Sequence, residues 1–305
     1  MGRAQRLGAT LLAVVVAGAL FAACGAPIVR AACDGKLVLS VPGTIQSTAI
    51  VEPSGLVASR QNAGTLWLLN DSGDTARLHA ISESGAARAT YTLTGATAVD
   101  WEALALSTGP VSGRAYLYAA DIGDNQYNRS SIVVYRVAEP VITTTGAQTL
   151  TGVDVLTLRF PDGPNDAEAF FVDPRTGEMY IIQKSLSGGP VGVYRAPANL
   201  AAGSTTVMTR AGTLSLPTGS LMHAVTSADI TQDGDAIAVR TYGAVRLWYR
   251  NTDQTVATAL TAAPCAGPIP VEGQGETIGF RPDGRAYYTV TEGRGSEIHR
   301  FTIAP

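Results

Sequence analysis

The chain has 305 residues, of which 46% are hydrophobic and 15% are charged, and its formal net charge is −3. A charged share of about 25% is usual for soluble domains, so this surface is unusually uncharged. The weak negative charge argues against a nucleic-acid partner. The apolar content excludes an intrinsically disordered chain. Short Val, Ile, Leu and Tyr runs are interrupted by many of the 33 glycines, which argues against a helical bundle.

The N-terminus has the features of a bacterial export signal, which we assign to residues 1–23. A basic start is followed by an uncharged apolar stretch that ends in small residues around Cys24. The residues before Cys24 are similar to a lipobox, although Phe21 stands where leucine is usual. Lipidation of Cys24, plain cleavage near Ala23 and a retained anchor all stay open. We expect a cell-envelope lipoprotein or a secreted protein, with residues 24–33 as a short tether.

Two further cysteines, Cys33 and Cys265, fit this interpretation. They are an even number in an oxidising compartment, where pairing is expected. The alternative is that they are two unrelated buried thiols. The sequence contains no CxxC pair and no Cys/His cluster, so zinc and iron–sulfur sites are unsupported.

Five segments of the chain repeat one pattern, and they begin at residues 54, 102, 168, 226 and 276. Each contains a short apolar strand, a tight turn, a second strand that is mostly aromatic-rich, and a third strand after a polar loop. A more polar fourth strand closes four of the units. The spacings are 48, 66, 58 and 50 residues. This pattern of WD40-like repeats predicts an all-β, five-bladed β-propeller with four strands per blade over residues 34–305.

The fifth unit reaches the C-terminus after three strands. We expect its missing fourth strand to be residues 36–41, which would join the first and last blades and remove an open sheet edge. Cys33 precedes this strand and Cys265 lies between the fourth and fifth units, so ring closure would make the two cysteines neighbours. The alternative is six blades, with a degenerate blade hidden in residues 201–217.

The first position of each unit is predicted to form one ring around the central channel, because the innermost strands of a propeller line it. Its members are Ser54, Glu102, Glu168, Thr226 and Glu276. At an effective dielectric of about 20 and a spacing of ~5 Å, each carboxylate pair would repel by about 3 kcal/mol. Protons or a cation would relieve this repulsion, and an all-oxygen site favours calcium over magnesium. Alternatively, the glutamates accept backbone N–H bonds from the neighbouring blade or face a water-filled channel.

A second polar set is expected at one mouth of the channel, where innermost strands begin and second strands end. Asp100 and Asp166 stand two residues before ring positions. The loops at this mouth are expected to bind a ligand through Asp71, Asp74, Asp121, Asp124, Asn125, Lys184, Arg240 and Glu292. Lys184 and Arg240 belong to adjacent blades and could together hold an anion. Ordinary turn chemistry is the alternative explanation for the first of these loops. The opposite face, built of short turns, is expected to leave little room for a site.

One hydroxyl or carboxyl residue per blade, as in Ser54, Glu102, Glu168, Thr226 and Glu276, resembles the calcium-activated nucleotidases (secreted apyrases), which are five-bladed propellers with a central calcium. Thr226 stands where that family tends to have serine, and the loops differ. The resemblance implies an axial calcium more strongly than nucleotide hydrolysis, because a fold does not determine its chemistry. The repeat pattern is also similar to uncharacterised exported propeller proteins of high-GC bacteria.

Two functions follow from these observations. The first is an exported, calcium-stabilised, monomeric propeller that binds a small molecule or a protein at one face, with membrane contact only through an N-terminal lipid. The second is a calcium-dependent hydrolase of phosphoesters, nucleotides or glycans at the same face, with Asp100, Asp166 or Asp124 as candidates to activate water. The sequence contains no GxSxG, P-loop or HExxH motif and no evident nucleophile–base pair, which favours the first.

Overall fold

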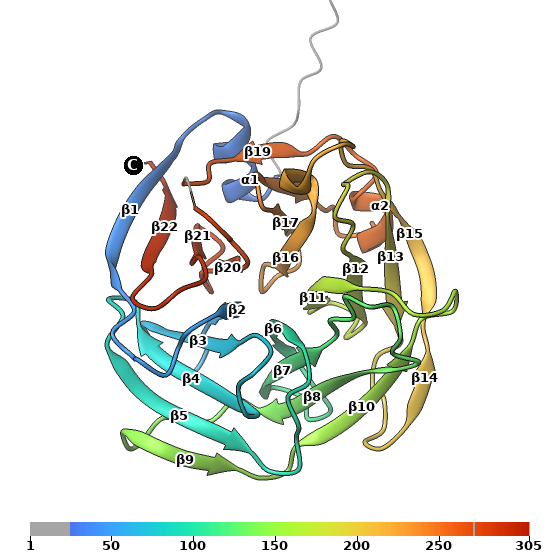
Figure 1. The fold of residues 1–305 in the computed structure, drawn as a ribbon. Coiled ribbons are helices and arrows are strands. Elements are labelled where there is room, and N and C mark those ends of the chain that lie inside the picture. The colour runs from blue at the N-terminus through green and yellow to red at the C-terminus, as the bar shows by residue number, and fades with distance from the viewer. Residues whose placement is uncertain (1–24, 271, 305) are drawn as a thin grey trace, which may run out of the picture.

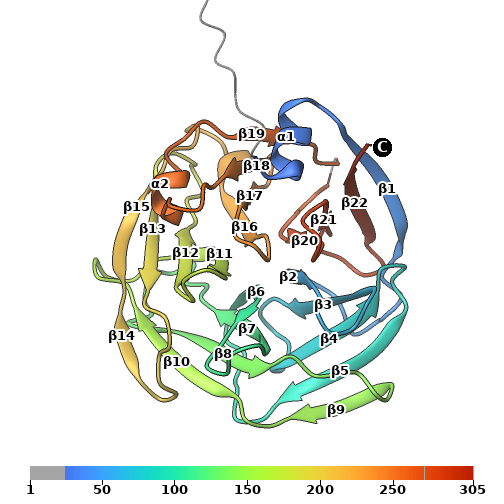
Figure 2. The same ribbon diagram turned by 180° about the vertical axis from the view of Figure 1, so that it is seen from behind.

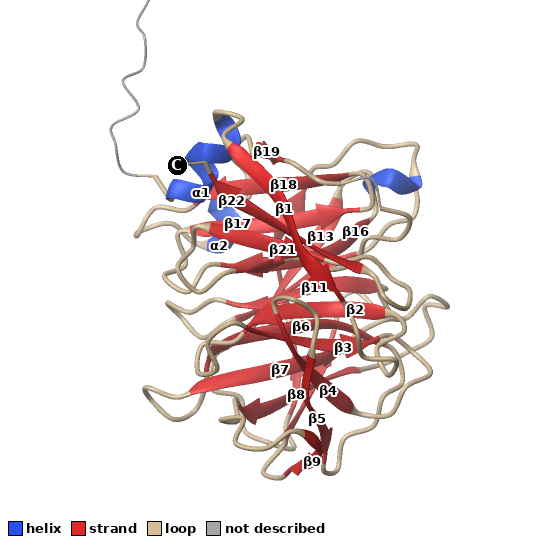
Figure 3. Ribbon diagram, turned by 90° about the vertical axis from the view of Figure 1, so that its left-hand side faces the viewer, coloured by secondary structure: helices blue, strands red, loops and turns tan. Residues whose placement is uncertain are grey.

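Five β-sheets surround a central axis in the computed structural model, which describes residues 25–270 and 272–304 (Figure 1). The same ring is seen from behind in Figure 2, and edge-on in Figure 3, where loops project from both faces. The prediction of a five-bladed propeller is therefore confirmed. The export signal and Cys24 lie outside the described residues. Among the described residues, no helix is long and apolar enough to cross a membrane.

The first three blades differ in their number of strands, which follow one another from the axis outward. The first contains β2 (Pro53–Ala58), β3 (Thr65–Asn70), β4 (Arg77–Ser82), β5 (Ala87–Leu93) and β9 (Gly146–Leu150). The second contains β6 (Trp101–Thr108), β7 (Ala115–Asp121), β8 (Ile132–Ala138), β10 (Asp154–Arg159) and β14 (Thr205–Val207). The third contains β11 (Ala167–Val172), β12 (Met179–Gln183), β13 (Val191–Ala196) and β15 (Thr209–Leu214).

The last two blades have four strands each. The fourth contains β16 (Val225–Ile230), β17 (Ala236–Thr241), β18 (Ala244–Tyr249) and β19 (Cys265–Gly267). The fifth contains β20 (Gly279–Phe280), β21 (Ala286–Thr289), β22 (Glu297–Ile303) and β1 (Leu37–Thr44). Three short helical segments complete the described chain: α1 (Pro27–Cys33), α2 (Val256–Ala259) and the 3₁₀ turn η1 (Leu221–His223).

The inner strands are apolar on both faces because each blade packs against two neighbours. Every residue of β2, β11 and β16 is buried. Hydrophobic clusters fill the space between each neighbouring pair of blades; Trp67 and Leu117, for example, belong to the cluster between the first and second. This arrangement explains why the strands read as short apolar runs and not as alternating patterns.

The predicted closure of the ring is confirmed. β1 pairs antiparallel with β22, from Leu37 opposite Ile303 to Thr44 opposite Glu297, and Figure 1 shows the N-terminal strand beside the C-terminal one. Cys33, at the end of α1, forms a disulfide with Cys265 in β19, with a Cα–Cα distance of 4.9 Å. The structure differs from the expected tether at residues 24–33, because Ile28 and Val29 of α1 are buried against the fourth and fifth blades.

The first two blades carry a fifth strand, which the repeat pattern did not predict. β9 follows β8 of the second blade along the chain but pairs in parallel with β5 of the first. β14 follows β13 of the third blade but pairs in parallel with β10 of the second. Each of these strands thus ties a blade to the one before it. The six-blade alternative is excluded, since residues 201–217 supply β14 and β15 to existing sheets.

Candidate metal centre at one mouth of the channel

The five predicted ring residues occupy equivalent, buried positions in the five blades. In the first four blades the pairing of the two inner strands shifts by one residue across the ring position, so that residue lies in a β-bulge. In the fifth blade the pairing also shifts by one residue between Gly275 and Gly279, a stretch that includes Glu276. A bulge leaves one residue outside the ladder and re-aims its side chain. The repeated bulge therefore sets the ring residues apart from the sheet pairing.

The two hydroxyl members of the ring connect neighbouring blades. Ser54 Oγ donates to the carbonyl oxygen of Trp101, at 2.7 Å, and Thr226 Oγ1 donates to that of Gly275, at 2.9 Å. Backbone contacts with the neighbouring blade were the alternative considered for the glutamates. In the structure, these contacts are made by the hydroxyls, and they act as donors.

The third-blade carboxylate, Glu168, is ion-paired with Lys184. Both side chains are more than nine-tenths buried. Lys184 also lies over the ring of Tyr242, with Nζ 5.6 Å from the ring centroid. One of the three carboxylates expected to repel one another is thus compensated by a neighbouring cation, and Glu102 and Glu276 remain.

Glu102 and Glu276 belong to a larger acidic cluster at the mouth where the innermost strands begin. Its members are Asp71, Asp100, Glu102, Glu276 and Glu292. Carboxylate oxygens of Asp71, Asp100 and Glu102 lie within 4.8 Å of one another, and so do those of Asp71, Glu276 and Glu292. Asp71 is therefore shared by two triads of carboxylates that come from the first, second and fifth blades. Acidic groups that could hold a metal ion meet here, as the sequence predicted in outline.

Crowding and burial favour the protonated forms of these acids. Burial, with the charges of neighbouring carboxylates, raises the pKa of Asp71 to about 6. Burial raises the pKa of Glu292 to about 8, and a hydrogen bond with Glu276 adds to the effect. Burial also raises the pKa of Asp100, and it raises that of Glu102 well above its ordinary value. The cluster thus favours either protons or a cation.

The pKa of Glu292 predicts a specific pH dependence for metal-free protein. Its folded-state pKa lies above the ordinary 4.5, so the folded state holds the proton more tightly than the unfolded state. The contribution of Glu292 to stability therefore decreases as the pH rises from about 4.5 to about 8. In excess chelator, we expect the melting temperature to fall less steeply between pH 5 and pH 8 for Glu292→Gln than for the native protein. Parallel pH profiles of the two proteins would contradict this.

Two further residues shape the cluster, and the sequence pattern did not single them out. Tyr242 donates a hydrogen bond to Glu276 Oε1, at 2.8 Å. Gly123 approaches so closely that a Cβ atom there would lie 2.6 Å from Glu102 Oε1. Tyr242 follows the end of a second strand, as Asp71 does, which was the available signal. The need for glycine at position 123 is visible only in the folded chain.

The other acidic loop residues make the local contacts typical of turns. Asp124 accepts hydrogen bonds from the backbone N–H groups of Asn128 and Arg129. Asp121 is ion-paired with Arg129, at 2.8 Å. The remaining predicted residues of this group are placed as follows: Asp74 pairs with Arg77, Asp166 accepts from the backbone N–H of Asp124, and Asn125 is exposed. For Asp74, Asp121 and Asp124, ordinary turn chemistry accounts for the contacts.

The two cations expected to hold an anion at the mouth are both engaged within the protein. Lys184 pairs with Glu168. Arg240 is fully buried, pairs with Glu272 and donates to the carbonyl oxygen of Thr277, at 2.8 Å. Its guanidinium group therefore does not face solvent at the mouth. An arginine on the innermost pair of strands can be buried because Glu272 supplies the compensating charge.

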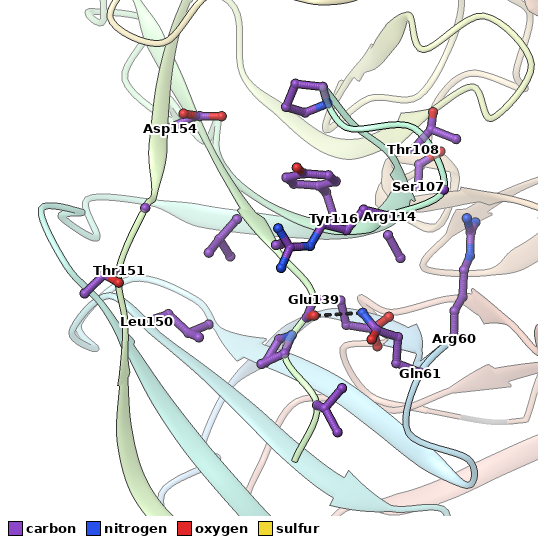
Figure 4. A pocket seen from close by; sticks show the side chains of 18 of the residues that line it. Arg60, Gln61, Ser107, Thr108, Arg114, Tyr116, Glu139, Leu150, Thr151 and Asp154 are labelled. Atoms are coloured by element: carbon purple, nitrogen blue, oxygen red, sulfur yellow. Dashed lines mark hydrogen bonds between the residues drawn. The ribbon is translucent and has the colours of Figure 1, made fainter. Parts of the chain in front are cut away.

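The expectation that the opposite face leaves little room is wrong at the junction of the first and second blades. A cavity of about 990 Å³ lies there, lined by the ends of β6 and β8, the start of β7, and the segment that follows β9 (Figure 4). The detour of the chain through β9 forms one wall. The 66-residue spacing between the second and third units is the trace of this detour in the sequence.

Comparisons with solved structures detect proteins that are similar over most of this chain. A gluconolactonase from Xanthomonas campestris shares 10% identity at a TM-score of 0.47, covering 90% of this chain and 92% of its own. A glutaminyl cyclase from Myxococcus xanthus shares 11% identity at a TM-score of 0.43, covering 88% and 98%. A protein from Bacteroides fragilis described as a putative 6-phosphogluconolactonase shares 13% identity at a TM-score of 0.39, covering 84% and 88%. No family model and no curated protein matches the chain. We transfer no function from these similarities.

Proposed function

We propose that this chain is an exported, calcium-binding β-propeller whose cation site is the acidic cluster at the mouth. The observation that carries the proposal is the position of Asp71, whose carboxylate oxygens lie within 4.8 Å of those of two other pairs of acids. Export is proposed from the N-terminal signal, and the Cys33–Cys265 disulfide is consistent with an oxidising compartment. The resemblance to the calcium-activated nucleotidases supports the choice of metal.

The donor set of the cluster suits a hard cation. All five side chains offer carboxylate oxygens, which calcium prefers. Glu102 is 3% exposed, and no donor in the described part of the chain forms a hydrogen bond with it. A buried carboxylate without such a partner is costly unless it is protonated or bound to a cation. Asp71, Glu102 and Glu276 come from the first, second and fifth blades, so a shared cation would fasten those blades together.

Calcium would also leave room for a ligand at this mouth. It takes about six to eight oxygen ligands, and each triad supplies three side chains. The free coordination positions would bind water or oxygen atoms of a small molecule or a partner protein. The protein's own residues would set the surroundings: Tyr242 orients Glu276, and Lys184 neutralises Glu168 beside the cluster.

Calcium is expected to raise the melting temperature of chelator-treated protein. At a calcium concentration of about 100 times Kd, binding would stabilise the folded state by about 2.7 kcal/mol. For a chain of this size, that corresponds to a shift of roughly 5–10 °C. Scanning calorimetry after chelator treatment, with and without added calcium, measures the shift. Magnesium should give a smaller shift, because it demands strict octahedral geometry.

The shared acid gives the sharpest variant for this test. Asp71→Asn should abolish the calcium-dependent shift and raise the melting temperature in chelator, because it removes a charge from both triads. Asp253→Asn, an exposed acid in the loop after β18, is the matched control and should respond to calcium like the native protein. A native melting curve that is indifferent to both chelator and calcium would refute the proposal.

Hydrolysis at the same mouth is the second candidate function. It is favoured by Asp100, a half-buried member of the cluster whose raised pKa suits a group that accepts a proton from water. A panel of nucleotides, phosphoesters and glycans, assayed with calcium, tests it. Turnover that is lost in Asp100→Asn while calcium still raises the melting temperature would establish hydrolysis. No turnover across the panel would leave calcium-dependent binding as the function.

A further inference from the structure

The cavity on the opposite face has a positive balance of charge. Arg60, which follows β2, and Arg114, which precedes β7, both line it, and neither forms an ion pair within the described residues. Asp154 also lines the cavity, but its Oδ2 atom accepts from Nε and Nη2 of Arg136, at 2.9 and 2.7 Å. Glu139 is the remaining acid of the lining. Two arginines thus face one uncompensated carboxylate, so the cavity favours an anion.

The carboxylate of Glu139 is largely engaged on the side away from solvent. Its Oε1 atom accepts hydrogen bonds from Ser59 Oγ and from Trp67 Nε1, both on buried residues. Arg60 is held differently, by a single hydrogen bond from Nη2 to the carbonyl oxygen of Leu106, at 2.7 Å. Burial lowers the pKa of Arg60, which is the mark of a partly desolvated cation. Such a group gains from an anionic partner.

The exposed rim of the cavity offers hydrogen-bonding groups for a hydroxylated ligand. Thr108, Thr149 and Thr151 are exposed and line it, and so does Gln61, whose amide donates to the carbonyl oxygen of Glu139 at 2.8 Å. In the view of Figure 4, the Arg114 side chain reaches between Tyr116 and Glu139. Two buried polar atoms of the lining residues, Ser107 Oγ and Glu139 Oε2, have no hydrogen-bond partner in the described chain. Unpaired buried groups of this kind call for an explanation such as a bound molecule.

We propose that this cavity binds a small hydroxylated organic anion of the uronic-acid type. Arg114 and Arg60 would contact its carboxylate, and the threonine hydroxyls and Gln61 would contact its hydroxyl groups. A volume of about 990 Å³ is ample for a ligand of one or two sugar rings. The inference does not depend on the calcium site, since the two sites lie on opposite faces of the propeller.

The test is titration of the purified protein with D-glucuronate, followed by ligand-observed NMR, in the presence of a chelator. D-glucose is the neutral control, and inorganic phosphate is the anion without the sugar framework. We expect saturable binding of glucuronate with a Kd at least about tenfold lower than that of glucose or phosphate, because only glucuronate satisfies both arginines and hydroxyl groups.

Arg114→Ala should raise the Kd for glucuronate at least about tenfold without changing the melting temperature, because Arg114 is exposed. Arg285→Ala removes an exposed arginine from the same face, outside the cavity, and should bind like the native protein. Asp71→Asn should also bind glucuronate normally, which separates this site from the mouth. Equal binding of glucose, absence of saturation, or native affinity in Arg114→Ala would overturn the proposal, and phosphate binding as tight as glucuronate would overturn its sugar component.

Discussion

Loss of the Cys33–Cys265 disulfide is expected to lower the free energy of unfolding by about 5 kcal/mol, the largest effect that we predict for this protein. The bond closes a loop with a sequence separation of 232 residues. In the loop-entropy model, such a bond removes much of the conformational freedom of the unfolded chain. It also pins α1 beside β19, next to the place where β1 completes the fifth blade. Urea denaturation of the double variant Cys33→Ser/Cys265→Ser measures the loss.

Reduction supplies the control for this experiment. Dithiothreitol should move the unfolding midpoint of the native protein close to that of the double variant, and it should leave the double variant unchanged. Non-reducing mass spectrometry of the native protein should find the two cysteines joined. Two free thiols in protein isolated from an oxidising compartment would show that the closure is held by strand pairing alone.

Asp173→Ala is expected to destabilise the protein by about 3–5 kcal/mol, because it leaves the charge of Arg250 buried without a partner. Asp173 follows β11 in the third blade, and Arg250 follows β18 in the fourth. Their contact is bidentate, at 2.7 and 2.9 Å, and the side chains are 1% and 3% exposed. The pair therefore joins two neighbouring blades at a place where water cannot compensate the guanidinium group.

An exposed pair of the same chemistry provides the matched control. Asp283 pairs with Arg281 in the fifth blade, and the side chains are 36% and 39% exposed. Asp283→Ala should cost no more than about 1 kcal/mol. Adding Arg250→Met to Asp173→Ala should restore part of the lost stability, since no unpaired charge then remains. A loss in Asp173→Ala as small as that in Asp283→Ala, measured by urea denaturation, would contradict the prediction.

The cluster of acids at the mouth could be predicted only in part. The repeat register identified Glu102 and Glu276 as channel residues, because equivalent positions of repeated units must lie at equivalent places in a ring. Asp71 and Glu292 were expected at the same mouth as loop residues that bind a ligand. Their convergence with the ring into shared triads depends on how the loops after β3 and β21 fold, and no local pattern encodes that path.

Propeller architecture, the number of blades, closure by residues 36–41 and the pairing of Cys33 with Cys265 were determined by the sequence alone. A repeated unit that cannot bury its apolar faces alone must stack on copies of itself, and an incomplete last unit must be completed by the other end of the chain. Only the tertiary structure decided which charges meet. Lys184 compensates Glu168 and Arg240 is buried against Glu272, while β9 leaves its own blade and encloses a cavity with two unpaired arginines. These outcomes depend on contacts between residues distant in sequence, whose energies become comparable only once the blades are packed.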